Sequence, residues 1–511
     1  MSTANRVIKN TIFLYVKMCI TMFVSLYTTR LILQSLGSSD YGIFSVVGGA
    51  ITMLGFLNST LAYTTQRFLT YAEGEGNHYK QCKIFNISLS LHVLIAVLTV
   101  LFQLGVMYPL FNGILNIPDE REVAAKIVYL CLIFSTIITI VNATYDAVLN
   151  AHENMRFYSL IGILDALLRL LVVIACSHTS YDRLIFYGIL MALIPVITHV
   201  VTRCYCDKKY SECKVDIRKY WDYKLVKEIA TFSGWNFFIA MSSLFSVQGV
   251  GLTLNHFYGS KLNAAQGIAI QLNGYLSVFA SNMIKAINPT IVKSAGAKAT
   301  TSMHMITLLG CKYSTYLIML FAVPCILEIK FLLKIWLGPV PDWTALFCIL
   351  QITQAIMLQM VSPIATAVYA QGNIKFYSIF KTTMNLMPLL TTYIAFSFGA
   401  PPYWLYILMI IFYVIGGNVV IMVFAKKNCN FSFMEYFKDV SVPIHIVLLI
   451  MFVFGLITIL YMQDSFLRLI TTAIFTSLGF ILGVFSFGMK SFEKVYIKST
   501  LSRVRNKFFR I

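Results

Sequence analysis

Lys17 lies inside the first long apolar stretch of the chain, where a charged side chain needs a physical reason. A Lys or Arg at the centre of a bilayer costs roughly 2.5–3.5 kcal/mol on insertion scales. Thr21 and Ser25 follow Lys17 at helical spacing, so the three polar side chains form one stripe on a helix. This stripe could contact an anionic cargo. The alternative is that Lys17 extends to the membrane interface while the hydroxyls bond to their own backbone.

Four further cations and one amide are candidates for the same cargo site. Lys285 lies in a later apolar stretch, with Asn282 about one helical turn before it. Arg67 and Lys293 each follow a Gly-Ile pair at a similar distance, so they could receive a phosphate at the ends of two apolar stretches. Arg30 lies near the far end of the first stretch. Interfacial placement explains Arg30 more simply, and ordinary topology charges explain Arg67 and Lys293 equally well.

Carboxylates inside apolar stretches are candidates for coupling transport to an ion, either H+ or Na+. Asp165 and Arg169 are four residues apart, so they share one helix face. They form either an internal ion pair that fixes helix packing or a protonatable site whose pairing changes during transport. Asp146 is a further coupling candidate, near the end of the preceding apolar stretch.

The elements that position these residues are apolar helices. The chain is 58% hydrophobic and 12% charged, with a mean hydropathy of +0.76. Its apolar stretches of about 20 residues are each long enough to cross a membrane as a helix, and they are continuous rather than alternating. An all-α polytopic membrane protein is therefore predicted. Its 14 transmembrane helices are predicted at 11–36, 41–64, 84–108, 125–148, 158–177, 184–203, 229–254, 263–290, 306–327, 343–367, 378–399, 404–424, 443–462 and 467–488.

Membrane topology explains the net charge of +19 better than nucleic-acid binding does. With the N-terminus placed in the cytoplasm, most Lys and Arg residues fall in cytoplasmic loops, facing anionic lipids. Both termini are therefore predicted to be cytoplasmic. A nucleic-acid-binding tail at 489–511 is the less favoured alternative, and no nucleic-acid partner is expected. The 8 His and 11 Cys residues show no standard metal-ligand spacing, so neither a metal nor a cofactor is expected.

Two sequence echoes indicate an internal repeat. AHENMRFYS at 151–159 returns as AQGNIKFYS at 370–378, and LGSSDYGI at 36–43 returns as YGSKLNAAQGI at 258–268. Both pairs have an offset of six predicted spans, and an even offset makes the two copies enter the membrane in the same direction. We therefore expect two parallel six-helix lobes related by a pseudo-twofold axis along the membrane normal, plus two extra C-terminal helices.

This repeat predicts how the chain is divided and how it works. Rocking of one lobe against the other would expose the cleft between them to each side in turn, which is how a transporter operates. The non-cytoplasmic loops are short for acid–base catalysis, so an enzyme is not expected. The predicted parts are an N-terminal lobe (1–203), a basic cytoplasmic linker (204–228), a C-terminal lobe (229–424), two additional spans (425–488) and a basic cytoplasmic tail (489–511).

The whole chain resembles the Wzx-type polysaccharide flippases of the multidrug/oligosaccharidyl-lipid/polysaccharide exporter superfamily. The resemblance is densest in NTIFLYVKM (10–18), YTTRLILQSLGSSDYGIFSVVGG (27–49) and NSTLAYTTQRFLTYAEGEGN (58–77), and it continues in IPDERE (117–122), NAHENMRFYSLIG (150–162) and FSGWNFF (232–238). It implies transfer of an undecaprenyl-pyrophosphate-linked oligosaccharide across a bacterial inner membrane. The product would be O-antigen for lipopolysaccharide, capsule or exopolysaccharide. The implied partners are this lipid-linked oligosaccharide, membrane lipids and a polysaccharide polymerase or co-polymerase.

Two other functions compete with this interpretation. A cation-coupled multidrug exporter of the same fold would be expected to carry acidic residues in its lobe cavities. The first two spans of each predicted lobe instead contain no Asp or Glu, but they do contain Lys17, Arg30 and Lys285. A membrane polysaccharide polymerase or ligase would need a sizeable outer loop with acid–base residues, and the loops at 109–124 and 328–342 are short for that purpose.

Overall fold

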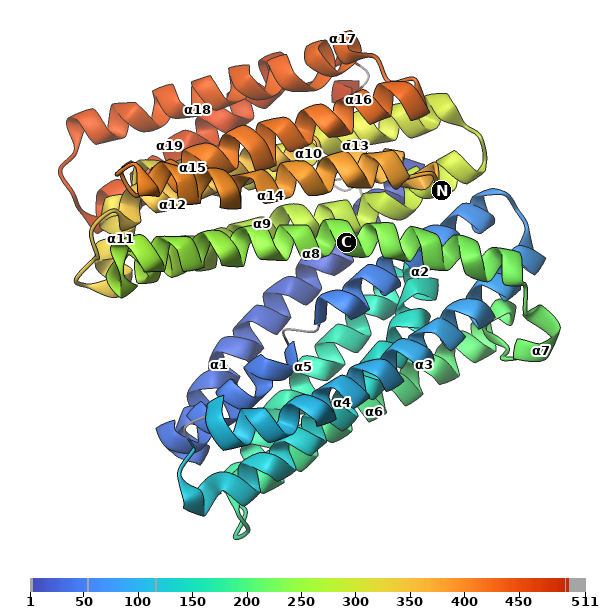
Figure 1. Cartoon of the computed structure of the whole chain (residues 1–511). Helices are drawn as coiled ribbons and strands as arrows, with labels where there is room; N and C mark the ends of the chain where they lie inside the picture. Colours follow the sequence, from blue (N-terminus) through green and yellow to red (C-terminus); the bar gives the residue numbers. More distant parts are fainter. Residues whose placement is uncertain (1–2, 53–54, 115–116, 492, 496–511) are drawn as a thin grey trace, which may run out of the picture. The chain divides into compact units, whose positions relative to one another are not determined.

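The computed structural model describes residues 3–52, 55–114, 117–491 and 493–495, and every secondary-structure element in these ranges is helical (Figure 1). The chain divides into two compact units. Unit 1 comprises Met1–Met241, Lys285–Met303 and Gly372–Lys375. Unit 2 comprises Ser242–Ile284, His304–Gln371 and Phe376–Ile511. The predicted linker at 204–228 lies within unit 1, and the predicted lobe boundaries stay predictions.

Unit 1 is built mainly from the first half of the chain. Its elements are α1 (Thr3–Thr52), α2 (Gly55–Gly74), α3 (His78–Pro109), η1 (Leu110–Ile114), α4 (Asp119–Ala151), α5 (Met155–Ser177), α6 (Arg183–Lys209), η2 (Ser211–Cys213) and α7 (Ile217–Tyr220). Two long helices, α8 (Tyr223–Tyr258) and α9 (Ser260–Gly296), each contribute one part to unit 1 and the other to unit 2.

Unit 2 holds the remaining helices, several of which run alongside one another in Figure 1. Its elements are α10 (Thr300–Leu327), which begins in unit 1, α11 (Ile329–Leu337), α12 (Thr344–Gln359), α13 (Ser362–Ala370), α14 (Lys375–Ser397), α15 (Trp404–Leu408), η3 (Met409–Gly416), α16 (Gly417–Cys429), α17 (Phe433–Tyr436), η4 (Phe437–Ser441), α18 (Val442–Tyr461), α19 (Phe466–Gly483) and η5 (Val484–Gly488).

Helices occupy the described residues of all 14 predicted spans. Not all of these helices are long and apolar enough to count as membrane spans. Within the described residues, 10 helices are long and apolar enough to cross a membrane. The number becomes 11 if α12 and α13, which meet at a 40° bend, form one span. The all-α membrane class is confirmed, whereas the count of 14 stays a prediction.

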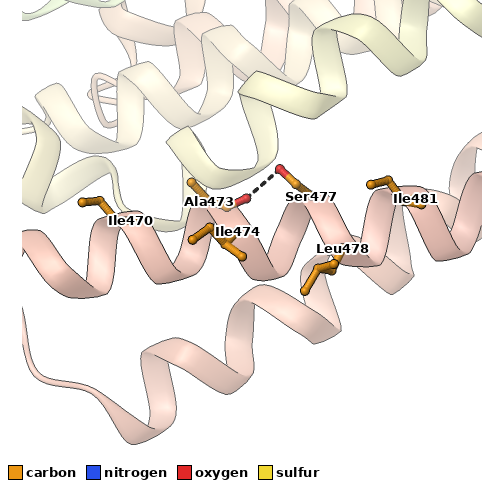
Figure 2. A pocket seen from close by; sticks show the side chains of 6 residues that line it. All are labelled: Ile470, Ala473, Ile474, Ser477, Leu478 and Ile481. Carbon is orange, nitrogen blue, oxygen red and sulfur yellow. Dashed lines mark hydrogen bonds between the residues drawn. The ribbon is translucent and has the colours of Figure 1, made fainter. Parts of the chain in front are cut away.

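The last long helix, α19, has an apolar outer face and a partly polar inner face, the reverse of a soluble protein. The outer face of α19 carries a shallow apolar groove (Figure 2), whose lining residues are Ile470, Ala473, Ile474, Ser477, Leu478 and Ile481. Ser477 donates a hydrogen bond to the Ala473 carbonyl at 2.7 Å, so its hydroxyl needs no external partner. Thr472 and Thr476, on the other face, are fully buried. This distribution suits a helix that faces lipid on one side.

The backbone repeats at both sequence echoes. Gly37, which divides α1 at a kink, has a φ of 80°, and its counterpart Gly259 has a φ of 78°. Glu153 has a φ of 53°, and its counterpart Gly372 has a φ of 88°. Left-handed residues are uncommon outside turns, so their recurrence at equivalent positions supports a duplication of the chain.

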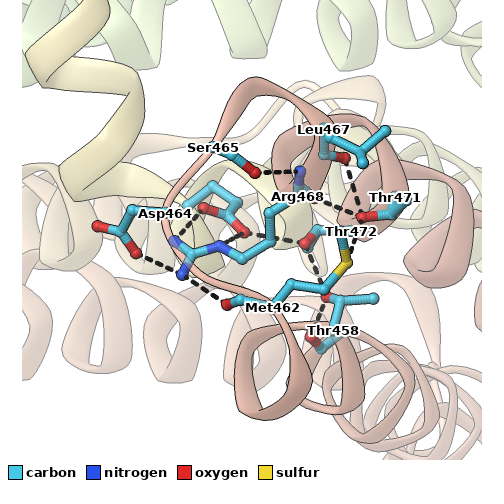
Figure 3. Close-up of polar contacts among 10 residues, drawn as sticks. Thr458, Met462, Asp464, Ser465, Leu467, Arg468, Thr471 and Thr472 are labelled. Atoms are coloured by element: carbon cyan, nitrogen blue, oxygen red, sulfur yellow. Dashed lines mark hydrogen bonds and ion pairs between the residues drawn. The ribbon is translucent and has the colours of Figure 1, made fainter.

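A buried ion pair holds the C-terminal helices of unit 2 to the end of α10 (Figure 3). Glu328 is fully buried and accepts hydrogen bonds from Arg468 Nε at 2.9 Å and from Nη2 at 2.8 Å. Thr472 donates a third bond to Glu328 at 2.9 Å, and Asp464 also pairs with Arg468. Removing one partner of such a pair leaves the other charge buried without compensation.

We expect Glu328→Ala to lower the free energy of unfolding by about 3–5 kcal/mol, because Arg468 loses its buried carboxylate. Glu122→Ala is the matched control. It removes a half-exposed i,i+4 partner of Lys126 and should change stability by no more than about 0.5 kcal/mol. Thermal unfolding of both purified variants in detergent measures the difference, and equal melting of the two would contradict this account.

Candidate functional site

Three helices of unit 1 meet at a small apolar cluster. Leu14 of α1, Met155 of α5 and Ala286 of α9 are buried against one another, and Tyr158 of α5 packs on them. The helices come from distant parts of the sequence, so only the fold brings these side chains together. The cluster fixes the position of the polar residues next to it.

Two of the predicted cargo residues lie beside this cluster and share one aromatic ring. The Lys17 ammonium lies 4.4 Å from the centre of the Tyr158 ring. The Lys285 ammonium lies 3.7 Å from the same centre. Each contact is a cation–π interaction, worth up to about 2 kcal/mol where the groups are shielded from water. The structure therefore brings Lys17 and Lys285 together, as the cargo-site hypothesis requires.

A glycine on α5 makes room for Lys17. A Cβ added to Gly162 would lie 2.1 Å from Lys17 Cε and 2.7 Å from its Nζ. Any larger residue at this position would displace the lysine from its place beside the Tyr158 ring. Gly162 is one helical turn beyond Tyr158, which explains why the ring and the glycine act on the same lysine.

Asp146 of α4 is the carboxylate of this site. It interacts electrostatically with both Lys285 and Lys17. Asn142, one turn earlier on α4, donates a hydrogen bond to Asp146 Oδ2 at 3.3 Å. A single carboxylate facing two ammonium groups leaves the site with an excess positive charge. We refer to Lys17, Asp146, Tyr158, Gly162 and Lys285 as the two-lysine site.

The other predicted residues lie apart from the two-lysine site or make local contacts. Thr21 donates to the Met18 carbonyl at 3.1 Å, which is the local backbone bond of the alternative interpretation. Ser25 and Arg30 are exposed. The lipid-interface explanation of Arg30 agrees with this exposure.

Two predictions concern residues on α5 and α9. Asp165 and Arg169 form the expected ion pair, with Arg169 Nε 2.8 Å from Asp165 Oδ2, and a coupling role for this pair stays a prediction. Asn282 is partly buried and belongs to the part of α9 in unit 2, whereas Lys285 begins the part in unit 1.

Arg67 is enclosed by aromatic rings rather than open to a cargo. Its guanidinium carbon lies 4.5 Å from the Phe68 ring centre, 5.0 Å from Tyr71 and 5.3 Å from Phe232. The side chain is only 5% exposed. A Cβ added to Gly372 would lie 2.8 Å from an Arg67 nitrogen, so the second repeat loop packs directly on this guanidinium.

Lys293 belongs to a charged network that involves the first repeat loop. It pairs with Glu73 of α2, whose other oxygen lies 3.2 Å from His152 Nδ1. His152 Nε2 bonds to Glu212, and the imidazole stacks on Tyr210 with ring centres 4.3 Å apart. No sequence pattern gave a role to Glu73 or His152, because their proximity arises only from packing of α2 against the end of α4.

The C-terminal ends of α2 and α9 cross beside this network, and each places a glycine against the backbone of the other. A Cβ on Gly74 would lie 2.2 Å from the Lys293 carbonyl oxygen, and a Cβ on Gly296 would lie 2.2 Å from the Tyr71 carbonyl oxygen. Both contacts are to backbone, so only glycine allows this approach. Lys293 is thus the counterpart of Tyr71 in this crossing, not of Arg67 as the Gly-Ile spacing predicts. We refer to this contact as the α2–α9 crossing.

Opposite charges set the ionisation of the network. Burial lowers the pKa of His152, but hydrogen bonds to Glu212 and Glu73 outweigh burial and raise it to about 9. Burial raises the pKa of Glu73, but hydrogen bonds from His152 and Lys293 outweigh this and hold it below its usual value. His152 is therefore protonated and Glu73 ionised at neutral pH.

Tyr158, Gly162 and His152 are functional candidates that sequence reasoning missed. Tyr158 and His152 lie within the repeated AHENMRFYS segment, so the echo itself was the available signal. That signal indicated a repeat but gave no role to individual residues.

Comparison with known proteins gives the fold. No protein-family model and no curated protein matches the chain. Among solved structures, it is similar to an outward-facing multidrug resistance MATE family transporter of the MOP superfamily, with 14% identity, a TM-score of 0.67 and coverage of 84% of this chain and 95% of that chain. A mutant of the Vibrio cholerae MATE transporter VcmN matches at 15% identity and a TM-score of 0.67, covering 85% of this chain and 98% of that one.

The chain shares the two-lobe fold of the MATE transporters of the MOP superfamily. A Pyrococcus furiosus MOP superfamily transporter also matches, at 15% identity and a TM-score of 0.66, covering 83% of this chain and 96% of that one. That protein is described as having a binding pocket of reverse polarity that suggests a different function.

The His152 network predicts a pH-dependent stability. Because the pKa of His152 is raised from 6.5 to about 9, its contribution is complete below about pH 6.5 and is lost as the pH rises through about 9. The shift corresponds to roughly 3 kcal/mol. We expect the stability difference between wild type and His152→Gln, measured by thermal unfolding in detergent, to shrink over this range.

His178→Gln, which alters an exposed histidine, is the control and should show no such trend. A His152→Gln difference that is independent of pH between about 6.5 and 9 would contradict the proposed ion pairs.

Proposed function

We propose that this protein is an alternating-access transporter that moves an amphiphile with an anionic head group. The two-lysine site supports this proposal, because two ammonium groups on one ring face a single carboxylate. The cargo that fits this charge and the sequence resemblance is an undecaprenyl-pyrophosphate-linked oligosaccharide. Its transfer across a bacterial inner membrane would serve polysaccharide synthesis.

The electrostatics of the site favour an anionic cargo. The two ammonium groups lie 4.4 and 3.7 Å from one ring centre, so they are at most about 8 Å apart, and two like charges at that distance repel by about 2 kcal/mol at an effective dielectric constant of 20. The Lys17 and Lys285 ammonium groups converge on one ring, so a pyrophosphate between or beside them would relieve this repulsion. Asp146 already offsets part of the charge, which would let the head group leave again.

The α2–α9 crossing would close one end of the transport path. Backbone contact at Gly74 and Gly296 leaves no room for a head group between these helix ends. Given the predicted topology, with both termini in the cytoplasm, this end is the cytoplasmic one. Breaking the Lys293–Glu73 pair would then accompany opening to that side.

A cation-coupled multidrug exporter is the second candidate, and the structural comparisons favour it over lipid-linked oligosaccharide transfer. Two of the similar solved structures are described as MATE transporters, one of them a multidrug resistance protein. Asp146 beside the two lysines would then be a coupling carboxylate that binds H+ or Na+. The charge of the two-lysine site is what favours an anionic cargo in this chain.

Transfer of cargo by the reconstituted full-length protein tests the proposal. We expect proteoliposomes to move a fluorescent polyprenyl-pyrophosphate-linked sugar between leaflets. The Lys17→Ala and Lys285→Ala double variant should lose at least about tenfold in rate, because charge-assisted contacts are each worth about 1.5–3 kcal/mol.

Lys126→Ala, which removes a half-exposed lysine of an i,i+4 pair, is the control and should transport normally. Unchanged transfer in the double variant would remove the two-lysine site from the proposal. Movement of cationic dyes without movement of the lipid-linked sugar would favour the exporter.

A further inference from the structure

Unit 2 contains a buried lysine to which the proposed function gives no role. Lys381 of α14 is 9% exposed and lies at membrane depth in the predicted span 378–399. Its ammonium donates a hydrogen bond to the Tyr413 carbonyl at 3.4 Å, which is long for such a bond. The Tyr413 ring centre lies 5.2 Å from the same nitrogen.

The other buried cations described in unit 2 are held by carboxylates. Lys312 Nζ lies 2.6 and 2.7 Å from the two oxygens of Glu493, and Arg468 is paired with Glu328. Among the ion pairs of the described residues, none involves Lys381. Lys381 therefore differs from Lys312 and Arg468, because it has no anionic partner within the described part of the chain.

The backbone around Lys381 is shaped to admit the side chain. A Cβ added to Gly417 would lie 2.1 Å from the Lys381 nitrogen, so a larger residue would move the ammonium from the place where α16 passes it. Gly417 follows η3, a π-helical segment that contains Tyr413. Short π-helical segments occur frequently at functional sites.

Neutral polar groups surround the lysine. Ser378, one turn before Lys381 on α14, is fully buried and its hydroxyl has no recorded hydrogen-bond partner. Asn385, one turn later, donates to Ser242 of α8 at 3.1 Å. Tyr413 shares a hydrogen bond of 2.7 Å with Ser243 of α8, which leaves its hydroxyl engaged away from the ammonium.

No charged residue faces Lys381 in the contacts described for these helices. Tyr413 is the titratable group that faces it from η3. The charged residues and the histidine of the packed helices lie near the helix ends, namely Lys375 on α14, Lys224, Lys227, Glu228 and His256 on α8, and Lys426 and Lys427 on α16.

We propose that Lys381 is a proton-binding site, at which the buried amine takes up and releases a proton. A permanently charged ammonium is unfavourable where it is buried among neutral groups with no anion to offset it. Release of the proton removes that cost, because burial disfavours the charged form of a lysine. Use of this proton to drive the cycle rests on the proposed transport function, whereas proton binding itself does not.

Nitrogen NMR of the full-length protein in nanodiscs, labelled with ¹⁵N at lysine side chains, tests the proposal. We expect the Lys381 side-chain signal to change from ammonium to amine between about pH 6 and 9. Lys381→Arg should remove that signal and so assign it, because arginine stays charged. Lys312→Arg is the control, since Lys312 is also buried, at 2% exposure, but is paired with Glu493, and this variant should retain the signal.

A second variant tests the same site independently, in case Lys381→Arg does not fold. Gly417→Ala should push the ammonium from its place and shift the midpoint of the signal by about one pH unit. Absence of any titrating lysine signal would overturn the proposal.

A transport assay distinguishes failure of this proposal from failure of the proposed function. Lys381→Arg should bind cargo as the wild type does but lose the dependence of its transport rate on an imposed pH gradient. If Lys381→Arg transports with the wild-type pH dependence, the coupling role fails. If the wild type moves no cargo yet Lys381 titrates, the proposed function fails and the proton site stands.

Discussion

A positive charge inside an apolar helical bundle must be compensated, and the arrangement of this protein follows from how it does so. Arg468 and Lys312 are compensated by buried carboxylates, which tie the C-terminal helices of unit 2 together. Lys17 and Lys285 instead share the Tyr158 ring and one nearby carboxylate. The first kind of compensation is complete and structural. The second leaves a net positive charge, and this charge makes the site suitable for an anionic cargo.

Much of the fold follows from the sequence because apolar continuity and chain breaks are local properties. The break at 37–40 corresponds to the left-handed Gly37, and each predicted span is occupied by helix. Other features depend on distant contacts. The bend between α12 and α13 divides a span predicted as continuous, and α8 and α9 each contribute to both units. Hydropathy does not report either feature, since it averages over the residues that bend a helix or change its neighbours.

The sequence predicted the site through one signal only, namely that a charged residue inside a predicted membrane span usually has a function. That principle identified Lys17, Lys285 and Asp146, which the fold brings together. It did not identify the Tyr158 ring, because an aromatic residue in an apolar helix carries no signal of its own. Similar spacing after two Gly-Ile pairs suggested that Arg67 and Lys293 are equivalent. The α2–α9 crossing sets a different register, in which Lys293 pairs with Glu73 and Arg67 is enclosed by rings.

The central claim is that the two-lysine site accepts an anionic head group, and ligand binding measures this most directly. Farnesyl pyrophosphate and farnesol share one apolar chain and differ in charge, so their dissociation constants for the full-length protein in nanodiscs isolate the head-group contribution. The account predicts that the pyrophosphate binds at least about tenfold more tightly. This advantage should vanish when Lys17→Gln and Lys285→Gln are combined. Equal binding of the two ligands, or tighter binding of a lipophilic cation such as tetraphenylphosphonium, would contradict it.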